Sequence, residues 1–523
     1  SHTKLLATVF YYITRIILYV DGLMITWGWT GRAHDASLAV FTADGLEFAA
    51  HSERYSRIKN DKNLRPALIA EALEFGHPNK IYYYENDLLK KTRQLYAGQY
   101  KLLVKESPTT YMRRLLPTAP RSTRVSHHLS HAAAGYYTNP IQTDAAVLVL
   151  DSIGEWDTVS IWSGADTQLT KTWSQRYPHS VGIWYSAMTQ RIGLKPQEHE
   201  YILMGMAAIG DSSKYYDLIK MDFIKQMPSL NDPRTVFKRN CHRGCQDWRT
   251  DLNSVQDYAD IAAATQRIYE EIFELYCMIT AKITSKSNLV LMGGCSLNCV
   301  ANPIAYKYFN TVWIMPNPGD AGSAIGCVLA NKKQFMEFSH AYAGHNIPGE
   351  YPIEAIIQEL KDKKITAVAS GRSEFGPRAL GNRSILADPR GLDVKDRVNK
   401  IKHREAFRPF APMILEEHAP DYFEMPEKLT SSPFMQFVVK CRKPDEFPAI
   451  VHYDNTSRVQ TVSKENGSVR ILLERWYKET GCPMLLNTSL NIKGEPLVNT
   501  RVDAERWATE YGVKVCLPEL ETL

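Results

Sequence analysis

The sequence lacks a regular cysteine framework. Its nine cysteines are scattered through 523 residues, odd in number and without a repeated spacing. Proteins that depend on disulfide bonds usually carry an even number of cysteines at short, regular spacings. The pattern therefore argues against a disulfide-rich secreted domain and predicts a protein of the reducing cytoplasm.

The excess of one charge sign is small, and residues that promote disorder are also scarce. There are 62 Lys and Arg against 57 Asp and Glu, a net charge of +5, with 27 prolines and 29 glycines. These values exclude a collagen-like or largely disordered chain. At roughly 150 residues per domain, the length predicts two to four domains. The mild basic excess permits a polyanionic partner without requiring one.

No uninterrupted apolar run reaches the length of a membrane span. The longest candidate, Leu5 to Val20, is broken by Arg15 and closed by Asp21 and Gly22. A spanning helix needs roughly 20 predominantly apolar residues, and a signal peptide needs a small-residue cleavage site. We expect a packed helix in an apolar N-terminal extension, residues 1–22, and no membrane contact, with a membrane anchor as the less favoured alternative. Such an apolar helix could also form the interface of a homodimer.

A pattern of strand, loop and hairpin occurs twice. Residues 23–50 hold three apolar runs separated by a polar loop and an Asp44-Gly45 turn. Residues 145–177 repeat this order, with a loop after Asp151 and a turn predicted at Gly164. The repeat predicts a duplicated α/β fold. It places His34, Asp35 and Asp151 after first strands, where open α/β sheets bind ligands.

The composition changes after Ala330. Residues 260–286 have helical periodicity and precede a buried strand at 289–292. A polar stretch rich in Gly and Pro follows, before a new helix at 353–361 and a strand at 365–370. We expect two units, residues 23–335 and residues 350–523.

A pair of histidines marks a candidate metal site. His127 and His131 stand four residues apart at the start of a predicted helix and therefore project from one face. Asp151 and Asp320 could complete a mixed nitrogen and oxygen set, which suits Fe, Mn or Zn better than calcium. For an isolated HxxxH pair, an ordinary buried or surface histidine is the commoner explanation.

Two glycine turns precede predicted helix starts. Main-chain N–H groups in such turns can cradle phosphates. Together with the duplicated unit, the turns resemble the nucleotide cleft of the actin-like kinase superfamily. The candidate nucleotide-binding residues are Gly293, Gly294, Asn298, Gly319 and Gly322.

The last third of the chain concentrates cations between glycines and prolines. Arginine binds phosphate or carboxylate bidentately, and Asn and Ser can orient a small amide. Structural ion pairs are the alternative role for such arginines. The candidates are Arg378, Arg383, Lys402, Arg404 and Arg408, with Asn487 and Ser489.

Many ordered blocks resemble the O-carbamoyltransferase family of antibiotic tailoring and nodulation-factor modification, over nearly the whole chain from about Met24. They read HDASLAVF, ERYSRIK, HHLSHAAAGYY, LDSIGEWDT, MGMAAIG, GGCSLNCVANP, PGDAGSAIG, EFGPRALGNRS, FRPFAP and NTSLNIKGEP. The family usually has Gly-Leu-Ala-Pro-Tyr-Gly where this chain has GMAAIG, and a glycine where it has Asn455. These departures concern the shape of the acceptor pocket and the local fold.

The resemblance implies a fold and a two-step reaction. An actin-like, ribonuclease-H-like N-terminal domain would be fused to a smaller α/β domain similar to the threonylcarbamoyl-adenylate synthase fold. In the C-terminal domain, carbamoyl phosphate and ATP would give carbamoyl-adenylate and pyrophosphate. In the N-terminal domain, an acceptor hydroxyl would take the carbamoyl group and AMP would leave.

The resemblance also implies roles for the candidate residues. His127, His131, Asp151 and Asp320 would bind the metal, and magnesium would accompany ATP. The five C-terminal cations would neutralise phosphates, while Asn487 and Ser489 would hold the carbamoyl end. His34 and Asp35 lie where an acceptor hydroxyl could be oriented or deprotonated.

The acceptor and two other functions stay open at this point. Family members modify small natural products, sugars and oligosaccharides. Basic clusters with aromatics at 101–105, 113–114, 121–124 and 238–249 leave hydroxymethylated DNA as a second acceptor class, against an ordinary solvated charged face. The alternatives are a tRNA threonylcarbamoyl-transfer enzyme and a non-catalytic actin-like scaffold. Cys241, His242 and Cys245 form at most half a zinc site.

Overall fold

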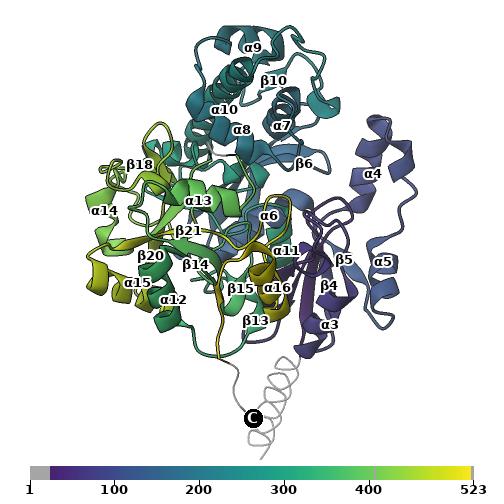
Figure 1. Cartoon of the computed structure of the whole chain (residues 1–523). Coiled ribbons are helices and arrows are strands. Elements are labelled where there is room, and N and C mark those ends of the chain that lie inside the picture. The colour runs from purple at the N-terminus through teal and green to yellow at the C-terminus, as the bar shows by residue number, and fades with distance from the viewer. Residues whose placement is uncertain (1–23, 406–407, 520–523) are drawn as a thin grey trace, which may run out of the picture.

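A computed structural model of the chain describes residues 24–405 and 408–519 (Figure 1). The extension predicted at residues 1–22 lies outside the described residues, so its helix and its role in a dimer stay predictions. None of the helices in the described ranges combines the length and the apolar character that a bilayer crossing needs.

The first sheet has the strand order β3-β2-β1-β4-β5. Strands β1 to β3 form an antiparallel meander, and β4 and β5 join it parallel to β1. The predicted strand, loop and hairpin are therefore confirmed. The bounds are β1 Thr26–Thr30, β2 Ser37–Phe41, β3 Leu46–His51, β4 Lys80–Tyr83 and β5 Ser122–Arg124. The helices of this region are α2 Glu53–Ser56, α3 Pro66–Glu74, α4 Asp87–Tyr96 and α5 Pro108–Leu115.

The second sheet repeats this arrangement as β8-β7-β6-β11-β12, again with a meander followed by two parallel strands. This shared order establishes the duplicated actin-like fold. The turn predicted at Gly164 is wrong: Gly164 lies inside β7, where an added Cβ would sit 2.0 Å from the Tyr136 ring. Packing requires that glycine. The bounds are β6 Ala145–Gly154, β7 Asp157–Ala165, β8 Gln168–Arg176, β11 Asn288–Met292 and β12 Thr311–Trp313.

Helices α6 (His127–Thr138) and α11 (Ser323–Lys332) pack together between the two sheets. Small residues allow the close approach: a Cβ on Gly326 would lie 1.8 Å from the Ser130 carbonyl oxygen, and one on Gly28 would lie 1.9 Å from that of Ala324. This contact brings the start of α6 next to the start of α11.

A helical region separates β8 from β11. Its longest helix, α10, begins after Ser254, which forms a capping box with Asp257, so it starts five residues earlier than the periodicity predicts. The bounds are α7 Val181–Arg191, α8 Glu200–Met206, α9 Tyr216–Phe223, β9 Ile224–Gln226, β10 Val236–Phe237 and α10 Val255–Thr284.

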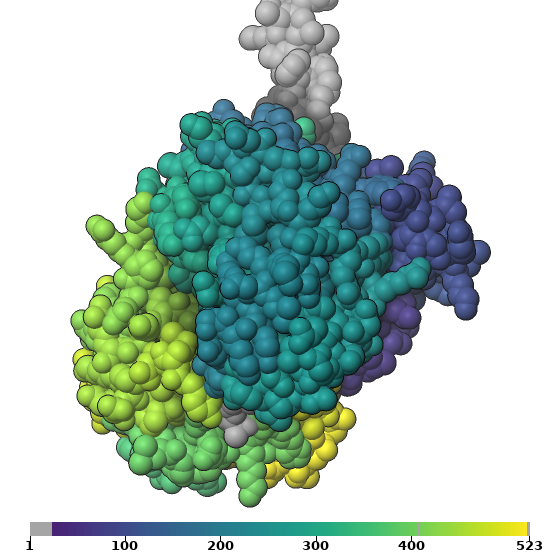
Figure 2. Space-filling model, turned by 90° about the horizontal axis from the view of Figure 1, so that it is seen from above, coloured from purple at the N-terminus to yellow at the C-terminus, as the bar shows by residue number. Residues whose placement is uncertain are grey.

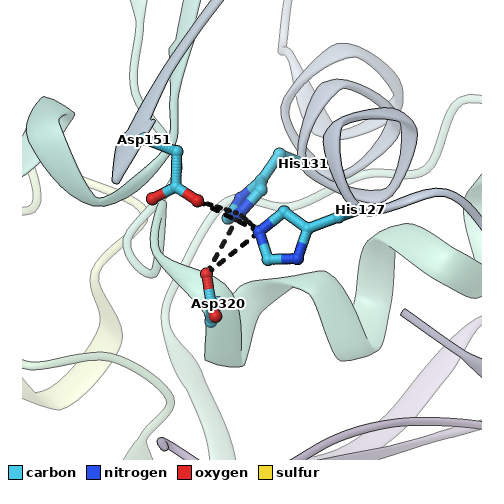
Figure 3. Close-up of side chains that lie close together, drawn as sticks. All are labelled: His127, His131, Asp151 and Asp320. Atoms are coloured by element: carbon cyan, nitrogen blue, oxygen red, sulfur yellow. Dashed lines mark hydrogen bonds and ion pairs between the residues drawn. The ribbon is translucent and has the colours of Figure 1, made fainter. Parts of the chain in front are cut away.

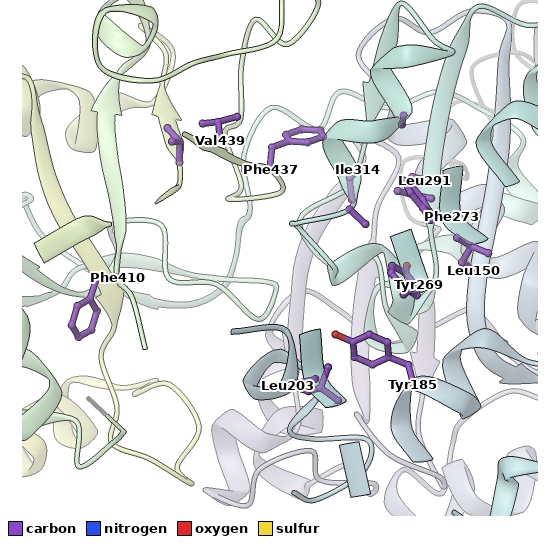
Figure 4. Close-up of a cluster of buried hydrophobic side chains, with 14 of the residues drawn as sticks. Leu150, Tyr185, Leu203, Tyr269, Phe273, Leu291, Ile314, Phe410, Phe437 and Val439 are labelled. Carbon is purple, nitrogen blue, oxygen red and sulfur yellow. The ribbon is translucent and has the colours of Figure 1, made fainter. Parts of the chain in front are cut away.

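The third large sheet has the order β20-β17-β21-β16-β14-β22 and confirms a second α/β unit. Its core is continuous with that of the second sheet: Phe410, Phe437 and Val439 belong to the same buried cluster as Leu150 and Leu291 (Figure 4). The strands are β13 Tyr342–Ile347, β14 Ile365–Ala369, β15 Gly371–Glu374, β16 Arg383–Ala387, β17 Ala411–Leu415, β18 Val438–Lys440, β19 Thr456–Arg458, β20 Gln460–Val462, β21 Met484–Ser489 and β22 Val515–Cys516. The helices are α12 Ile353–Lys363, α13 Val394–Ile401, α14 Ala419–Tyr422, α15 Gly467–Thr480 and α16 Arg501–Tyr511.

Candidate metal centre and cation cluster

Four predicted ligands meet at one point between the two N-terminal sheets (Figure 3). One ligand atom from each of His127, His131, Asp151 and Asp320 lies within 4.8 Å of all the others, and all four residues are buried. The Nε2 atoms of the two histidines are 3.1 Å apart, and each lies within 3.3 Å of Asp320 Oδ1. His127 Nε2 is 3.1 Å from Asp151 Oδ2.

This geometry fits a metal ion. Ligand atoms held about 2.1 Å from a shared cation stand roughly 3 to 3.5 Å apart, and two imidazoles with two carboxylates suit iron, manganese or zinc. Two ring nitrogens facing each other at 3.1 Å share at most one proton, whereas a cation between them would satisfy both. The donor set therefore fits the predicted metal.

Opposite charges stabilise the charged forms of His127 and Asp320 when no metal is bound. Burial alone would lower the pKa of His127, but Asp320 and Asp151 outweigh burial and hold this pKa well above its usual range. Burial likewise opposes ionisation of Asp320, yet His127 and His34 hold the pKa of that carboxyl well below its ordinary value. Charges of opposite sign thus compensate within the cluster.

The glycine turns position the two carboxylates. Gly293 has φ +91, and an added Cβ would lie 2.1 Å from the Leu150 carbonyl oxygen. Its N–H donates to the Pro318 carbonyl, which ties the two turns together, and Gly294 N–H donates to Asp151 Oδ1 at 3.2 Å. Gly322 N–H donates to the Gly319 carbonyl. Three of the predicted phosphate-binding N–H groups, those of Gly293, Gly294 and Gly322, therefore already donate to protein oxygens.

Asn298, also predicted to bind nucleotide, is committed elsewhere. Its side-chain amide exchanges two hydrogen bonds with Gln266 of α10, at 2.9 and 3.0 Å, and its Oδ1 also accepts from the Ala301 N–H. The side chain is only 9% exposed. The geometry assigns Asn298 to holding α10 against the glycine turn, and its nucleotide role stays a prediction.

His34 and Asp35 lie beside the metal ligands, in the loop between β1 and β2. His34 Nε2 is 3.4 Å from Asp320 Oδ2, and the His34 side chain is 44% exposed, unlike the four buried ligands. Asp35 adopts φ +48. Burial, followed by repulsion from Glu53, raises the pKa of Asp35 to about 6. The loop therefore offers an exposed imidazole and a perturbed carboxyl next to the cluster.

A second cluster, of four arginines, lies at the junction of the C-terminal unit with α8. Burial and then the charges of Arg458 and Arg408 affect Arg378, whose pKa falls to about 9. Burial, followed by the charges of Arg408 and Arg458, also holds the pKa of Arg404 well below its usual value. The Arg408 guanidinium lies 4.9 Å from the centre of the Tyr201 ring of α8. Arg458 is not among the predicted site residues, although it lies three residues after Asn455, where the chain departs from the family pattern.

Lys402, Asn487 and Ser489 assemble beside this arginine cluster. Lys402 Nζ donates to Ser489 Oγ at 3.1 Å and to Asn491 Oδ1 at 2.8 Å. Asn487 Nδ2 donates to the carbonyl of Ala379, the residue after Arg378. Asn487 Oδ1 is buried and has no donor among the described residues, so it can accept an N–H from a small ligand.

Arg383 occupies a different environment from the one predicted. It is fully buried, and its five N–H groups all donate to main-chain carbonyls, of Asn499, Ser370, Asn382, His345 and Gly371. No N–H remains for a phosphate. Arg383 therefore holds β13, β15 and the loop before α16 together, and we correct its predicted phosphate role. Its long-range carbonyl partners could not be read from a single sequence.

The two units are joined close to both clusters by residues that no pattern had singled out. Arg54 Nη2 donates to the Gly376 carbonyl at 2.8 Å, and Arg57 Nη2 donates to the Pro496 carbonyl at 2.8 Å. A small cavity at the same junction is lined by residues of both units, among them Ser296, Arg378 and Gln436. The block ERYSRIK was the available signal for this connection.

The half zinc site is not assembled. Cys245 Sγ faces the Ala187 carbonyl, and His242 Nδ1 lies 3.2 Å from the Tyr177 hydroxyl. Within the described ranges, the single group of His, Cys, Asp and Glu side chains close enough to hold a metal is the cluster at His127. Cys241 and Cys245 are therefore core residues.

Two family models match the chain in sequence. Residues 90–329 match the carbamoyltransferase N-terminus and residues 357–519 match the carbamoyltransferase C-terminus. The chain belongs to the carbamoyltransferase family. The predicted metal ligands fall inside the first matched segment, and the arginine cluster falls inside the second.

Other proteins resemble this chain over most of its length. An uncharacterized protein of Synechocystis, sll1178, is 32% identical across 90% of this chain and 92% of its own. Nodulation protein NolNO of Sinorhizobium fredii is 30% identical across 90% of this chain and 76% of its own. A solved structure, the activator of 2-hydroxyisocaproyl-CoA dehydratase from Clostridium difficile, is 10% identical across 59% of this chain and 96% of its own, with a TM-score of 0.33. That likeness is distant, so the repeated strand order carries the fold assignment.

Proposed function

We propose that this carbamoyltransferase activates a carbamoyl group as carbamoyl-adenylate in residues 350–523 and transfers it to an acceptor hydroxyl in residues 23–335. The acceptor would be a small natural product, a sugar or a hydroxymethylated pyrimidine. One observation carries the proposal: a candidate metal-ligand set with an exposed histidine and a cluster of four arginines, among which Glu405 pairs with Arg408, occur in one continuous body.

The first step uses the arginine cluster. Water cleaves carbamoyl phosphate to carbamate and phosphate, and a carbamate oxygen then attacks the α-phosphorus of ATP, so that pyrophosphate leaves. Arg378, Arg404 and Arg408 face the phosphates, where positive charge stabilises the transition state. Asn487 Oδ1, which has no donor among the described residues, accepts the carbamoyl N–H. Lys402 holds Ser489 in place.

The second step uses the cluster at His127. A divalent metal there would supply positive charge beside the adenylate phosphate, and magnesium would accompany ATP in the first step. Asp320 Oδ2 faces His34 Nε2, which favours the proton on that nitrogen and leaves Nδ1 free as a base. The acceptor oxygen attacks the carbamoyl carbon, its proton passes to His34 Nδ1, and AMP leaves.

The junction between the units supports transfer inside the protein. Ser296, in the turn that positions Asp151, and Arg378 line the same small cavity. Arg54 bonds to Gly376, two residues before Arg378, and therefore fixes this loop relative to the N-terminal unit. A scaffold protein would have no use for four neighbouring arginines with a single carboxylate partner at this position, and stability alone would select against them.

The experiment is release of pyrophosphate from ATP with and without carbamoyl phosphate, in the presence of magnesium. Release should require carbamoyl phosphate and fall about a hundredfold in Arg378→Gln. Arg397→Gln, which alters an exposed arginine on α13, is the matched control and should keep the activity. Release from ATP that does not depend on carbamoyl phosphate, or no release with any acceptor, would refute the proposal.

A further inference from the structure

One segment of the N-terminal unit has a larger net positive charge than the whole chain. Residues 87–124, here named the basic arm, hold nine Lys and Arg and two Asp and Glu, a net charge of +7 against +5 for all 523 residues. The arm contains α4 and α5, which stand out at one edge of the molecule (Figure 1), and it forms the dark blue projection in the space-filling view (Figure 2). Basic character is therefore concentrated there, as in nucleic-acid-binding surfaces.

The basic arm presents flat rings and cations to solvent. Tyr96 is 70% exposed and Tyr100 is 65% exposed, and the Tyr96 ring lies 5.5 Å from that of Trp156. Lys101 and Arg121 are exposed and have no hydrogen-bond or ion-pair partner in the described part of the chain. Exposed rings and unpaired cations on the same arm combine the two elements that bind single-stranded nucleic acid: stacking platforms and phosphate contacts.

Two hydrogen bonds attach the basic arm beside the metal ligands, one just before α4 and one at Lys105. The Asn86 N–H donates to Glu155 Oε1 at 2.5 Å, and the same oxygen accepts the His127 N–H at 3.2 Å. Lys105 Nζ donates to the carbonyl of Arg32, two residues before His34, at 2.7 Å. A ligand lying on the arm would therefore reach the exposed His34 side of the cluster.

We infer that the basic arm binds the acceptor, and that the acceptor is a single-stranded or locally unpaired nucleic acid whose base carries a hydroxymethyl group. This inference rests on the proposed function. Phosphates would contact Lys101 and Arg121, and bases would stack on Tyr96 and Tyr100. The hydroxymethyl oxygen then forms the new bond to the carbamoyl carbon while the bond to AMP breaks, with the proton passing to His34.

Charge decides among the other occupants of this surface. A neutral oligosaccharide would use the rings but leave the two exposed cations Lys101 and Arg121 without a role. A second copy docked by two-fold symmetry would place the basic arm against itself, and like charges would repel. An anionic membrane surface could use the cations and the exposed Leu88 and Leu95, so it forms one arm of the test.

The test is fluorescence anisotropy of the full chain with a labelled single-stranded oligonucleotide containing 5-hydroxymethylcytosine, without ATP or carbamoyl phosphate. Binding should weaken linearly on a log–log plot against salt. The double variant Tyr96→Ala/Tyr100→Ala should weaken binding at least about tenfold. Lys101→Gln/Arg121→Gln should reduce the salt slope by about 1.4, because each phosphate contact to a single strand contributes about 0.7.

Controls separate this inference from the proposed function. Lys333→Gln/Lys464→Gln, which alters two exposed lysines outside the arm, should bind and release pyrophosphate normally. Unchanged thermal midpoints in the arm variants would exclude misfolding. The inference is overturned if the arm variants bind the oligonucleotide as tightly as the parent does. It is also overturned if the arm binds anionic vesicles or neutral oligosaccharides instead. In both cases pyrophosphate release persists. Loss of release with arm-dependent binding retained refutes the proposed function alone. A mass gain of one carbamoyl group on the oligonucleotide supports both, and arm-dependent binding with release but without that gain overturns the acceptor assignment.

Discussion

The two charged clusters of this carbamoyltransferase differ in how their charges are balanced. At the metal-binding set, two carboxylates face two imidazoles at hydrogen-bonding distances. At the arginine cluster, Arg378, Arg404, Arg408 and Arg458 influence one another, and the ion pair between Arg408 and Glu405, at 3.5 Å, is the one described there. The first cluster can stay charged on its own, whereas the second has an excess of positive charge.

This difference indicates what each cluster lacks. A balanced set of buried ligands is ready for a cation, and removing one member leaves the others without a partner. Burial and the charges of Arg408 and Arg458 hold the pKa values of Arg378 and Arg404 below their usual range, which reduces the stability of the empty protein, and phosphates would remove that cost. Arg383 belongs to the same unit but needs no anion, because carbonyl oxygens accept from every one of its N–H groups.

The largest effect should come from removing a charge from the balanced cluster. Asp320→Asn keeps the volume but takes away the carboxylate that faces both histidines and His34. We expect bound metal to fall below stoichiometric levels and transfer to an acceptor to drop at least about a thousandfold. Metal content by mass spectrometry and product formation measure this. Asp157→Asn, in β7, is the control; full metal occupancy in Asp320→Asn would contradict the ligand assignment.

The next effect should fall on stability. Arg383→Met leaves five carbonyl oxygens without their donor in a fully buried position, at a cost of about 3 to 5 kcal/mol in the free energy of unfolding. Denaturant unfolding of the full chain measures it. Any loss of pyrophosphate release should follow the loss of folded protein. A variant that unfolds like the parent but releases no pyrophosphate would restore the phosphate role for Arg383.

Arg378→Gln should separate function from stability in the opposite direction. Removing one of four mutually repelling cations should leave the unfolding free energy unchanged or raise it by about 1 kcal/mol, while pyrophosphate release falls about a hundredfold. Added pyrophosphate should raise the thermal midpoint of the parent more than that of the variant. Destabilisation of the ligand-free variant would indicate a structural partner for Arg378 and break the contrast with Arg383.

These pairs also show what the sequence could predict. His127 and His131 follow from helical period, and Asp151 and Asp320 stand at glycine turns after strands, so local patterns together with the family resemblance point to the four side chains that the structure brings together. The role of Arg383 depends on carbonyls from Asn499 and His345, far away in the chain. Asn298 likewise depends on Gln266, 32 residues away. Charge type is local information, but whether a charge is already satisfied depends on the tertiary fold.

The smallest effect should come from Asp35, where function and stability oppose each other within the N-terminal site. Its pKa is raised to about 6 by burial and Glu53, so between about pH 4 and pH 6 the folded chain holds a proton that the unfolded chain has lost. Stability therefore falls as pH rises through this window.

Asp35→Asn removes the penalty and tolerates φ +48. In chelator-treated protein, the variant should gain about 1 to 3 kcal/mol over the parent at pH 7 and nothing below pH 4. Thermal midpoints across this range, with the exposed-turn variant Asp44→Asn as control, measure the gain. A gain that does not change with pH would show that the Asp35 carboxyl is not the titrating group.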